Sequence, residues 1–589
     1  MARRWLPLSR GGRHAGRLAA AVLLSVLSAP ALALHPGHRE PALAPAGVSV
    51  SRPVWGCPMC ESVRQSEPGT CPLCGMALVR LDAPASAAAT GPPPMMPGVP
   101  MWLVLTMAGT ILVVSFAILE LRGVRPVRRQ RGWRVDVLRL PGLRALLAHR
   151  AFPLVVQLPV VGLFVLVLAA GFVGNPDAGR NIAPVLTWTV WWALLVAVVL
   201  VFGKVWCTVC PWTALADWIA RWLPRFERPW PRALRSIWPA TVLFVGLTWL
   251  ELGYGVTEKP WLTASLGLLM VLLALCSRVL FERKAFCRYA CLVGRVSGLY
   301  ATFAASELRA ADAATCRQCR TKDCFHGNAR GAPCPTHEFL GAMQENTYCI
   351  LCMECVKSCP ESNVAWNVRP FAADLLESIR PRSDEGWLAV IMLSMSAFHG
   401  LTMTLWWDRL VQGIAASAGV GPLVAFSLGM AAMLVLPAAV YFGLCALMRW
   451  CARDERHGVY TLFVRFAYAL LPIALFYHLA HNAQHVFVEG KKLLRAASDP
   501  FGWGWDVFGT AQLPVDAVLP LEVGWGVQVA LVLVGHLYAL VIAHRTARAL
   551  YPDGNAAVAS QIPMLIAMVL FSWQSLWLLG QPMVMRTAM

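Results

Sequence analysis

Charged side chains are scarce in this sequence. Only 14% of its 589 residues are charged, against about 25% in ordinary soluble domains. Hydrophobic residues make up 57% of the chain, and the mean hydropathy is +0.56. This balance excludes an ordinary soluble domain and predicts a membrane protein.

Acidic residues are the scarcer of the two charged classes. There are 32 of them against 51 lysines and arginines, which gives a formal net charge of +19. A basic surplus of this kind can mark nucleic-acid binding. Here the basic residues cluster in short loops between apolar segments, as the positive-inside rule expects of a membrane protein. The charge is therefore no indication of a nucleic-acid partner.

Several cofactor motifs are also missing. No Cys-x-x-Cys-His motif for haem c is present, because Cys60 is followed by Glu61 and Cys210 by Pro211. No nucleotide or flavin motif is visible either, since glycine-containing stretches such as Gly419 to Gly421 lack a strand–helix context. We therefore expect the electron donor to be another protein on the cytoplasmic side.

Residues 1–33 are typical of a secretory signal peptide. A basic start is followed by an apolar run from Leu18 to Leu27, and Ala31-Leu32-Ala33 fits the small-residue cleavage pattern. An uncleaved membrane anchor is the alternative. Both interpretations place residues 34–99 on the periplasmic side of a bacterial inner membrane.

About ten apolar segments are long enough to cross a bilayer. Five lie within residues 100–300 and five within residues 381–589. Arginine-rich loops follow the first, third, seventh and ninth segments, and the positive-inside rule predicts that these loops are cytoplasmic. The C-terminus is then periplasmic. The predicted spans are 101–121, 153–173, 183–203, 237–254, 261–281, 386–408, 422–448, 459–483, 524–545 and 559–581.

The cytoplasmic region at residues 301–380 carries two strings of cysteines. The second is Cys349-x2-Cys352-x2-Cys355-x3-Cys359-Pro360, which matches the bacterial ferredoxin run whose fourth cysteine ligates the other cluster. The first string departs from this run, because four residues separate Cys319 from Cys324. Paired zinc knuckles are the alternative. We predict two [4Fe–4S] clusters, one on Cys316, Cys319, Cys324 and Cys359, and the other on Cys334, Cys349, Cys352 and Cys355.

Residues 150–370 resemble the membrane-bound polyferredoxins of the NapH, NosR and CcoG type. The resemblance rests on the two strings and on two motifs at the ends of spans, Trp206-Cys207-Thr208-Val209-Cys210-Pro211 and Phe286-Cys287-Arg288-Tyr289-Ala290-Cys291. The family has Cys-x3-Cys-Pro in both places. Here the first motif is Cys-x2-Cys-Pro, and the second has Leu292 in place of proline. The resemblance implies electron transfer across or along the membrane.

The cysteines of these two motifs form an internal repeat at the predicted cytoplasmic ends of two spans. Four thiols can therefore converge on one metal ion or redox centre. Reduced, structural thiols that cap helix ends are the alternative. The basic neighbours Lys204, Lys284 and Arg288 are expected to lower the thiol pKa values and favour thiolates. The candidate ligands are Cys207, Cys210, Cys287 and Cys291.

Residues 34–99 contain a second pair of short-spaced cysteine units. Cys57 and Cys60 form one unit, and Cys71 and Cys74 form the other. Four thiolates suit Zn²⁺, and the adjoining methionines also suit Cu(I). The segment resembles the small heavy-metal-binding domain appended to copper efflux proteins, which has histidine where this chain has Cys60. We predict a periplasmic metal knuckle, with a structural zinc ribbon as the alternative.

Five histidines lie in or beside the later apolar spans. Ionisable residues there usually face the bundle interior, and the predicted depths are compatible with one shared site in the outer half of the membrane. Bis-histidine haem b, copper and a quinone pocket are the candidates. The alternative is histidines that hydrogen-bond to backbone carbonyls. The residues are His399, His478, His481, His485 and His536.

These features predict a polytopic α-helical membrane protein of about ten transmembrane helices. It carries a cytoplasmic two-cluster ferredoxin-like α+β insertion and a small periplasmic metal knuckle of four cysteines. The first functional hypothesis is an electron conduit to a quinone, a haem or a periplasmic metal centre. The alternatives are a copper or heavy-metal reductase or metal-site assembly factor, and an iron–sulfur sensor or assembly partner without turnover.

Overall fold

The structure is a computed structural model that describes residues 55–56, 64–65, 79–80, 95–122, 132–377, 379–514 and 517–584. The chain divides into two units, one of which is Ala20–Pro94. In that unit three short strands form an antiparallel sheet in the order β2-β1-β3, with β1 (Trp55–Gly56) between β2 (Arg64–Gln65) and β3 (Val79–Arg80). The predicted signal peptide and the four knuckle cysteines lie outside the described residues.

The second unit contains a helical segment at each of the ten predicted spans. Eight of the described helices are long and apolar enough to cross a membrane, which indicates a multi-pass membrane protein. The two that are not among these eight are α9, with 16 residues, and α16, whose first turn is acidic. The segments are α2 (Met101–Arg122), α4 (Phe152–Val173), α5 (Ile182–Pro184) with η4 (Val185–Trp191) and α6 (Trp192–Phe202), α9 (Trp238–Gly253), α10 (Pro260–Leu280), α16 (Ser383–Thr402), α18 (Pro422–Cys451), α19 (Val459–Glu489), α21 (Leu521–Leu550) and α22 (Gly554–Leu579).

One predicted boundary was wrong. The span expected at 386–408 ends as α16 at Thr402, and a separate amphipathic helix, α17 (Leu405–Ala418), follows it. Thr404 has an extended backbone, with φ −98° and ψ 149°, so the helix cannot continue through it. Apolar residues continue through Trp406 and Trp407, so the helix break at Thr404 could not be predicted from the hydropathy pattern.

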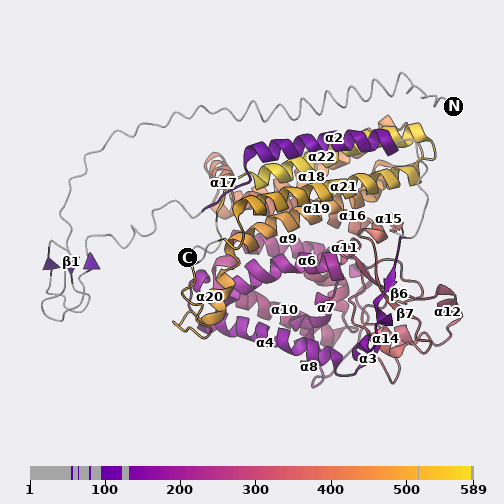
Figure 1. Ribbon diagram of the computed structural model, residues 1–589, viewed down its shortest axis with the longest axis horizontal. Helices are drawn as coiled ribbons and strands as arrows, with labels where there is room; N and C mark the ends of the chain where they lie inside the picture. Colours follow the sequence, from indigo (N-terminus) through magenta and orange to yellow (C-terminus); the bar gives the residue numbers. More distant parts are fainter. Residues whose placement is uncertain are drawn as a thin grey trace. The chain divides into compact units, whose positions relative to one another are not determined.

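Successive long helices alternate in direction along the bundle. One end of the bundle carries the cysteine strings at residues 316–359, and we call it the ferredoxin end (Figure 1). There, Arg545 Nη1 donates to the Leu376 carbonyl at 3.0 Å. At the opposite end, Val99 N donates to the Leu579 carbonyl at 2.8 Å and β4 (Met95–Met96) pairs with β8 (Met583–Val584). Figure 1 shows β6, β7, α12 and α14 at one end of the bundle and α17 and α20 (Lys492–Ser498) at the other.

A three-stranded sheet closes the cysteine-rich segment at the ferredoxin end. Its order is β5-β7-β6, and all pairs are antiparallel. The strands β6 (Ser306–Ala310) and β7 (Val364–Val368) stand immediately before and after the cysteine strings, and β5 (Val135–Asp136) brings in the chain that follows α2. Between β6 and β7 lie the short helices α12 (Ala313–Gln318), α13 (Asp323–His326) and α14 (Glu354–Ser358).

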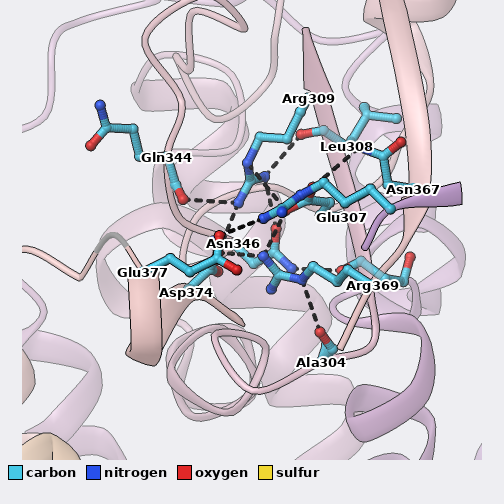
Figure 2. A network of polar contacts seen from close by, with 12 residues as sticks. Ala304, Glu307, Leu308, Arg309, Gln344, Asn346, Asn367, Arg369, Asp374 and Glu377 are labelled. Carbon is cyan, nitrogen blue, oxygen red and sulfur yellow. Dashed lines mark hydrogen bonds and ion pairs between the residues drawn. The ribbon is translucent and has the colours of Figure 1, made fainter. Parts of the chain in front are cut away.

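A buried ion network fastens this sheet to α15 (Ala373–Glu377). Arg369 Nη1 bonds both the Glu307 carboxylate, at 2.7 Å, and the Asp374 carboxylate, and all three side chains are at most 2% exposed. Arg309 adds a further contact to Asp374 (Figure 2), and Arg134 contacts Glu307 at 2.7 Å. Burial alone would raise the pKa of Glu307, but Arg309 and Arg369 lower it to about 2. The stability that this carboxylate contributes is therefore complete above pH 4.5 and is lost as the pH falls toward 2.

Replacement of Arg369 is expected to be severely destabilising. The substitution Arg369→Met removes the most buried cation that Glu307 and Asp374 share and leaves them only Arg309 and Arg134, so the cost should be near the lower end of the about 3–5 kcal/mol for a broken buried ion pair. Scanning fluorimetry of the detergent-solubilised protein would measure the fall in unfolding midpoint. The matched control is Arg139→Met, because Arg139 is 88% exposed and lies 3.8 Å from Asp136. Equal midpoints for the two variants would contradict this prediction.

Candidate functional site

One group of thiols surrounds a small cavity at the ferredoxin end. The cavity has a volume of about 30 Å³, and Cys334, Cys349, Cys352 and Cys355 line it together with Cys324. Leu351 and Met353 have left-handed backbones, with φ of 55° and 62°. These two turns let three closely spaced cysteines face the same point. The Glu338 amide donates to Cys334 Sγ at 3.3 Å, which ties the distant fourth cysteine to its place.

A second group contains Cys316, Cys319, Cys324 and Cys359. Asn363 links its two ends, since its side-chain amide donates to Cys316 Sγ and its backbone N–H to Cys359 Sγ, both at 3.3 Å. Burial raises the pKa of Cys324, and the nearby Cys359, Cys316 and Cys319 raise it further. The structure places the members of each set close to one another, with Cys324 also at the cavity of the other set, and the crossed ligand assignment stays a prediction.

The irregular spacing in the first string forms a local turn. Lys322 has a left-handed backbone, with φ 49°, and α13 begins at the next residue and carries Cys324. The longer spacing therefore makes a turn before α13, and Cys324 remains beside the other cysteines of its group.

The two end-of-span pairs come together as a third group of thiols, which we call the thiol quartet: Cys207, Cys210, Cys287 and Cys291. Cys210, Cys287 and Cys291 are buried, and each of these three is close enough to Cys207 for its charge to act on their pKa values. Residues next to both pairs, Pro211 and Leu292, line one cavity. The two halves of the repeat therefore converge, as the sequence predicted.

The two halves share a backbone pattern despite their different spacing. Each starts at a residue with positive φ, Gly203 at 70° or Lys284 at 60°, and ends seven residues later at an extended cysteine that begins the next helix. The first half forms α7 (Trp206–Val209), and the second forms a π turn, η7 (Phe286–Ala290). A π turn holds more residues than an α turn, so it accommodates the extra residue between the second pair of cysteines.

The expectation of low thiol pKa values was wrong. Burial raises the pKa of Cys210 to about 12 and that of Cys287 to about 11, and it raises the pKa of Cys291 well above its usual range. Lys284 lowers the pKa of Cys287, but it also pairs with Asp217 at 2.7 Å. The desolvation of the thiolates outweighs the nearby cations.

Hydrogen bonds from residues beside the quartet reach the segment between β6 and β7, residues 311–363, which we call the ferredoxin segment. Lys204 Nζ donates to the Thr347 carbonyl at 3.3 Å, and Arg295 donates to the same oxygen. The Thr208 hydroxyl donates to the Ile350 carbonyl at 2.5 Å. These carbonyls flank Cys349, and the Lys204 charge acts both on that thiol and on those of the quartet. A buried lysine thus stands between two of the three thiol groups.

Among the described residues, no group of three or more His, Cys, Asp or Glu side chains is arranged to hold a metal ion. This holds for the ferredoxin cysteines as well as for the quartet. A cubane cluster spreads its four thiolates over four irons instead of gathering them on one ion.

The five membrane histidines do not form one site. His399, His481 and His485 line a small polar cavity with Glu489, and the His485 ring bonds Glu489 at 2.9 Å. The other two do not line it. His478 contacts the Tyr300 hydroxyl, and His536 bonds the Ser115 and Ser572 hydroxyls, so these partners are side chains and not the backbone carbonyls that the alternative names.

An apolar cavity beside the quartet was missed by sequence reasoning. Its volume is about 220 Å³, and it lies between α4, η4, α7, α10 and α11 (Leu292–Tyr300). Five tryptophans line it: Trp188, Trp191, Trp192, Trp206 and Trp212. The sequence holds 25 tryptophans, and no periodicity separates these five from those at the membrane surface.

Comparison with known families finds two domains. Residues 54–80 match a heavy metal binding domain, and residues 184–229 and 263–305 match a 4Fe-4S binding domain. The two latter segments contain all four cysteines of the quartet and end before Cys316. No curated protein and no solved structure matches the chain. Iron–sulfur binding and a role in electron transfer in a membrane protein are therefore supported.

The raised pKa values predict slow modification of the quartet. After iron is removed with ferricyanide and EDTA and the thiols are reduced again, Cys210 should react with iodoacetamide at pH 8 at least about 100-fold more slowly than a free thiol, because so little of it is thiolate. Its rate should rise about tenfold for each pH unit up to pH 10. Peptide mass spectrometry would follow both rates, and a plateau near pH 8 would contradict the prediction.

Proposed function

We propose that the protein carries electrons through iron–sulfur clusters between its ferredoxin segment and the membrane interior. The observation that carries this proposal is the junction at Thr347–Ile350. There, Lys204, Arg295 and Thr208 hold the chain on either side of Cys349 against the thiol quartet. A continuous series of thiol groups therefore leads from the ferredoxin end into the bundle.

Two [4Fe–4S] clusters occupy the ferredoxin segment in this proposal. Each cluster accepts and releases one electron when bound. The hydrogen bonds from Asn363 and Glu338 to cysteine sulfurs support the assignment, because N–H donors stabilise the negative sulfurs of a cluster and tune its potential. The ligands are Cys316, Cys319, Cys324 and Cys359 for one cluster, and Cys334, Cys349, Cys352 and Cys355 for the other.

A third iron–sulfur cluster is proposed for the quartet. Four cysteines match the usual ligand count of such a cluster, and both halves fall within segments that match a 4Fe-4S binding domain. Lys204 and Arg295 are each 2% exposed beside these thiols, and both donate to a backbone carbonyl. The negative charge of a bound cluster would compensate these two buried cations.

The proposed setting is the bacterial inner membrane, with the ferredoxin segment in the cytoplasm and residues 34–99 and the C-terminus in the periplasm. The signal-like start and the arginine-rich loops support this orientation. The donor would be a cytoplasmic redox protein. A large hollow of about 1220 Å³ beside the sheet, lined by Arg139, Arg309, Arg317 and Arg380 among others, suits an acidic partner.

A second candidate function is metal handling. It rests on the match of residues 54–80 to a heavy metal binding domain. In this version the domain holds zinc or copper on Cys57, Cys60, Cys71 and Cys74, and electrons from the clusters reduce the metal or support assembly of a metal site. Metal content of the purified protein discriminates the two, because only this version needs stoichiometric zinc or copper on residues 34–99.

Loss of one ferredoxin ligand should remove one cluster. The wild-type protein should contain about 12 irons per chain, four in each of three clusters, and Cys349→Ala should lose about four of them. Iron analysis and EPR after dithionite reduction would test this, and the spin-coupled signal of the cluster pair should disappear. The control is Cys445→Ala, since Cys445 is buried in α18 and lines none of the described thiol sites. A preparation that holds only zinc would overturn the proposal.

The quartet can be tested separately from the ferredoxin segment. The double variant Cys207→Ala/Cys287→Ala should lose about four irons and keep the spin-coupled signal of the cluster pair. If the wild-type protein contains only about eight irons and the variant loses none, the third cluster is wrong while the two-cluster assignment stands.

A further inference from the structure

A hollow of about 850 Å³ lies where the ferredoxin segment meets the ends of the membrane helices, and we call it the basic hollow. Its walls come from the start of α4, from α8 (Pro211–Ile219), from the chain after α10, from the loop at residues 326–333 and from α14. Four separate stretches of chain each contribute one arginine to these walls: Arg150, Arg221, Arg283 and Arg330.

The two carboxylates that line the basic hollow are already paired with other cations. Glu354 pairs with Lys357 at 2.8 Å. Asp217 pairs with Lys284 at 2.7 Å, and Arg283 acts on it only at longer range. In the part of the chain that the structure describes, none of the four arginines forms an ion pair with a carboxylate. The hollow therefore presents a surplus of positive charge that suits an anionic ligand.

The basic hollow lies at the level where a bilayer surface would be. Arg150 comes just before the apolar span that begins at Phe152, and Arg283 comes just after the span that ends at Leu280. Next to α8, Trp222 is 89% exposed, and tryptophan is enriched where a bilayer meets water. The arginines of the hollow therefore lie at the depth of the lipid headgroups.

Beside the arginines, the wall of the basic hollow becomes apolar. Pro153 and Leu154 line it from α4, and Leu154 is 47% exposed. Val155 and Leu158, which are 62% and 51% exposed, extend this apolar surface along the same helix. A ligand that matches both parts of the site has an anionic head and apolar chains.

We propose that the basic hollow binds the phosphate of an anionic phospholipid, whose acyl chains lie on the exposed apolar surface of α4. Guanidinium groups form strong, charge-assisted hydrogen bonds with phosphate oxygens, and basic pockets between membrane helices bind lipid headgroups in this way. A soluble phosphate compound would use the arginines alone and would leave the apolar surface without a role. The inference goes beyond the proposed function and shares only its membrane setting, since it does not require that the clusters carry electrons.

A lipid in the basic hollow would connect the ferredoxin segment to the membrane helices. Arg330 belongs to a loop that is fixed to the segment, because the Asn328 side chain donates to the Ser358 carbonyl at 2.8 Å. On the membrane side, Gln157 of α4 lines the hollow and donates to the Thr208 carbonyl beside the quartet at 2.9 Å. A headgroup bound by arginines of both parts would therefore stabilise the contact between the ferredoxin segment and the helix ends that carry the quartet.

Lipid binding can be measured by native mass spectrometry of the full-length protein in detergent. Dioleoylphosphatidylglycerol would be titrated into the wild-type protein and into Arg150→Gln/Arg283→Gln. Each lost arginine should raise the Kd of the first bound lipid by about 5-fold, which gives about 25-fold for the pair. The matched control is Arg232→Gln, which should leave the Kd unchanged, because Arg232 is exposed in the loop after α8 and does not line the hollow.

Hydrogen exchange of residues 326–333 would locate the bound lipid. Phosphatidylglycerol should slow this exchange in the wild-type protein but not in the double variant, and phosphatidylcholine should slow it in neither. An equal effect of sn-glycerol 3-phosphate, which has the phosphate but no acyl chains, would overturn the lipid in favour of a soluble anion. A Kd that the double variant leaves unchanged, or equal binding of the two lipids, would overturn the site.

The iron content of each variant separates this inference from the proposed function. The lipid measurements involve no electron transfer, so their failure in iron-replete protein leaves the clusters as assigned. Weaker lipid binding in the double variant supports the site even where the wild-type protein holds no clusters. If the double variant loses iron that the wild type holds, the single variants Arg150→Gln and Arg221→Gln, both at exposed positions, provide the same comparison.

Discussion

The cysteine-rich segment depends on how its two ends are held. It leaves the sheet at β6 and returns at β7, and the antiparallel pairing of these strands together with Arg369 brings both ends to the same place. Within the closed segment there is little regular structure, since its helices are only four to six residues long. The position of its thiols therefore follows from the closure, from the left-handed turns and from the hydrogen bonds to sulfur. The same closure sets Thr347 and Ile350 against the helix ends that carry the quartet.

The buried charges around Thr347–Ile350 are consistent with clusters in the adjoining thiol groups. Several buried cations lie at the ferredoxin end, and only some of them form ion pairs with carboxylates. Arg369 forms ion pairs with Glu307 and Asp374, and Lys284 forms one with Asp217. Lys204 and Arg295 instead donate to a backbone carbonyl beside the thiols. The Glu338 carboxylate acts on both of these cations and the Glu385 carboxylate acts on Arg295, and thiolate-ligated clusters in the adjoining groups would add further negative charge.

The parts of this architecture that could be predicted from sequence have strong local signals. Long apolar runs set the positions of the helices, and close cysteine spacing set the groups of thiols in the ferredoxin segment. The break at Thr404 could not be predicted, because the apolar run continues across it. The thiol pKa values were misjudged since the burial of Cys210 and Cys291 depends on the packing of helices distant in sequence. The division of the histidines has the same origin: His478 and His481 are three residues apart, yet they contact different neighbours. The cavity between the tryptophans exists only once α4, η4, α10 and α11 are packed together.

The π turn at Phe286–Ala290 has a consequence for how the two halves of the repeat should be compared. The wider turn holds one more residue and one fewer residue precedes it, so Cys-x2-Cys and Cys-x3-Cys end at the same interval from the residue with positive φ. A pattern defined by a fixed number of intervening residues would class the halves as unrelated. What the two halves have in common is the seven-residue interval between a residue with positive φ and the cysteine that begins the next helix. The extra residue between the second pair of cysteines is therefore offset by one fewer residue before Cys287.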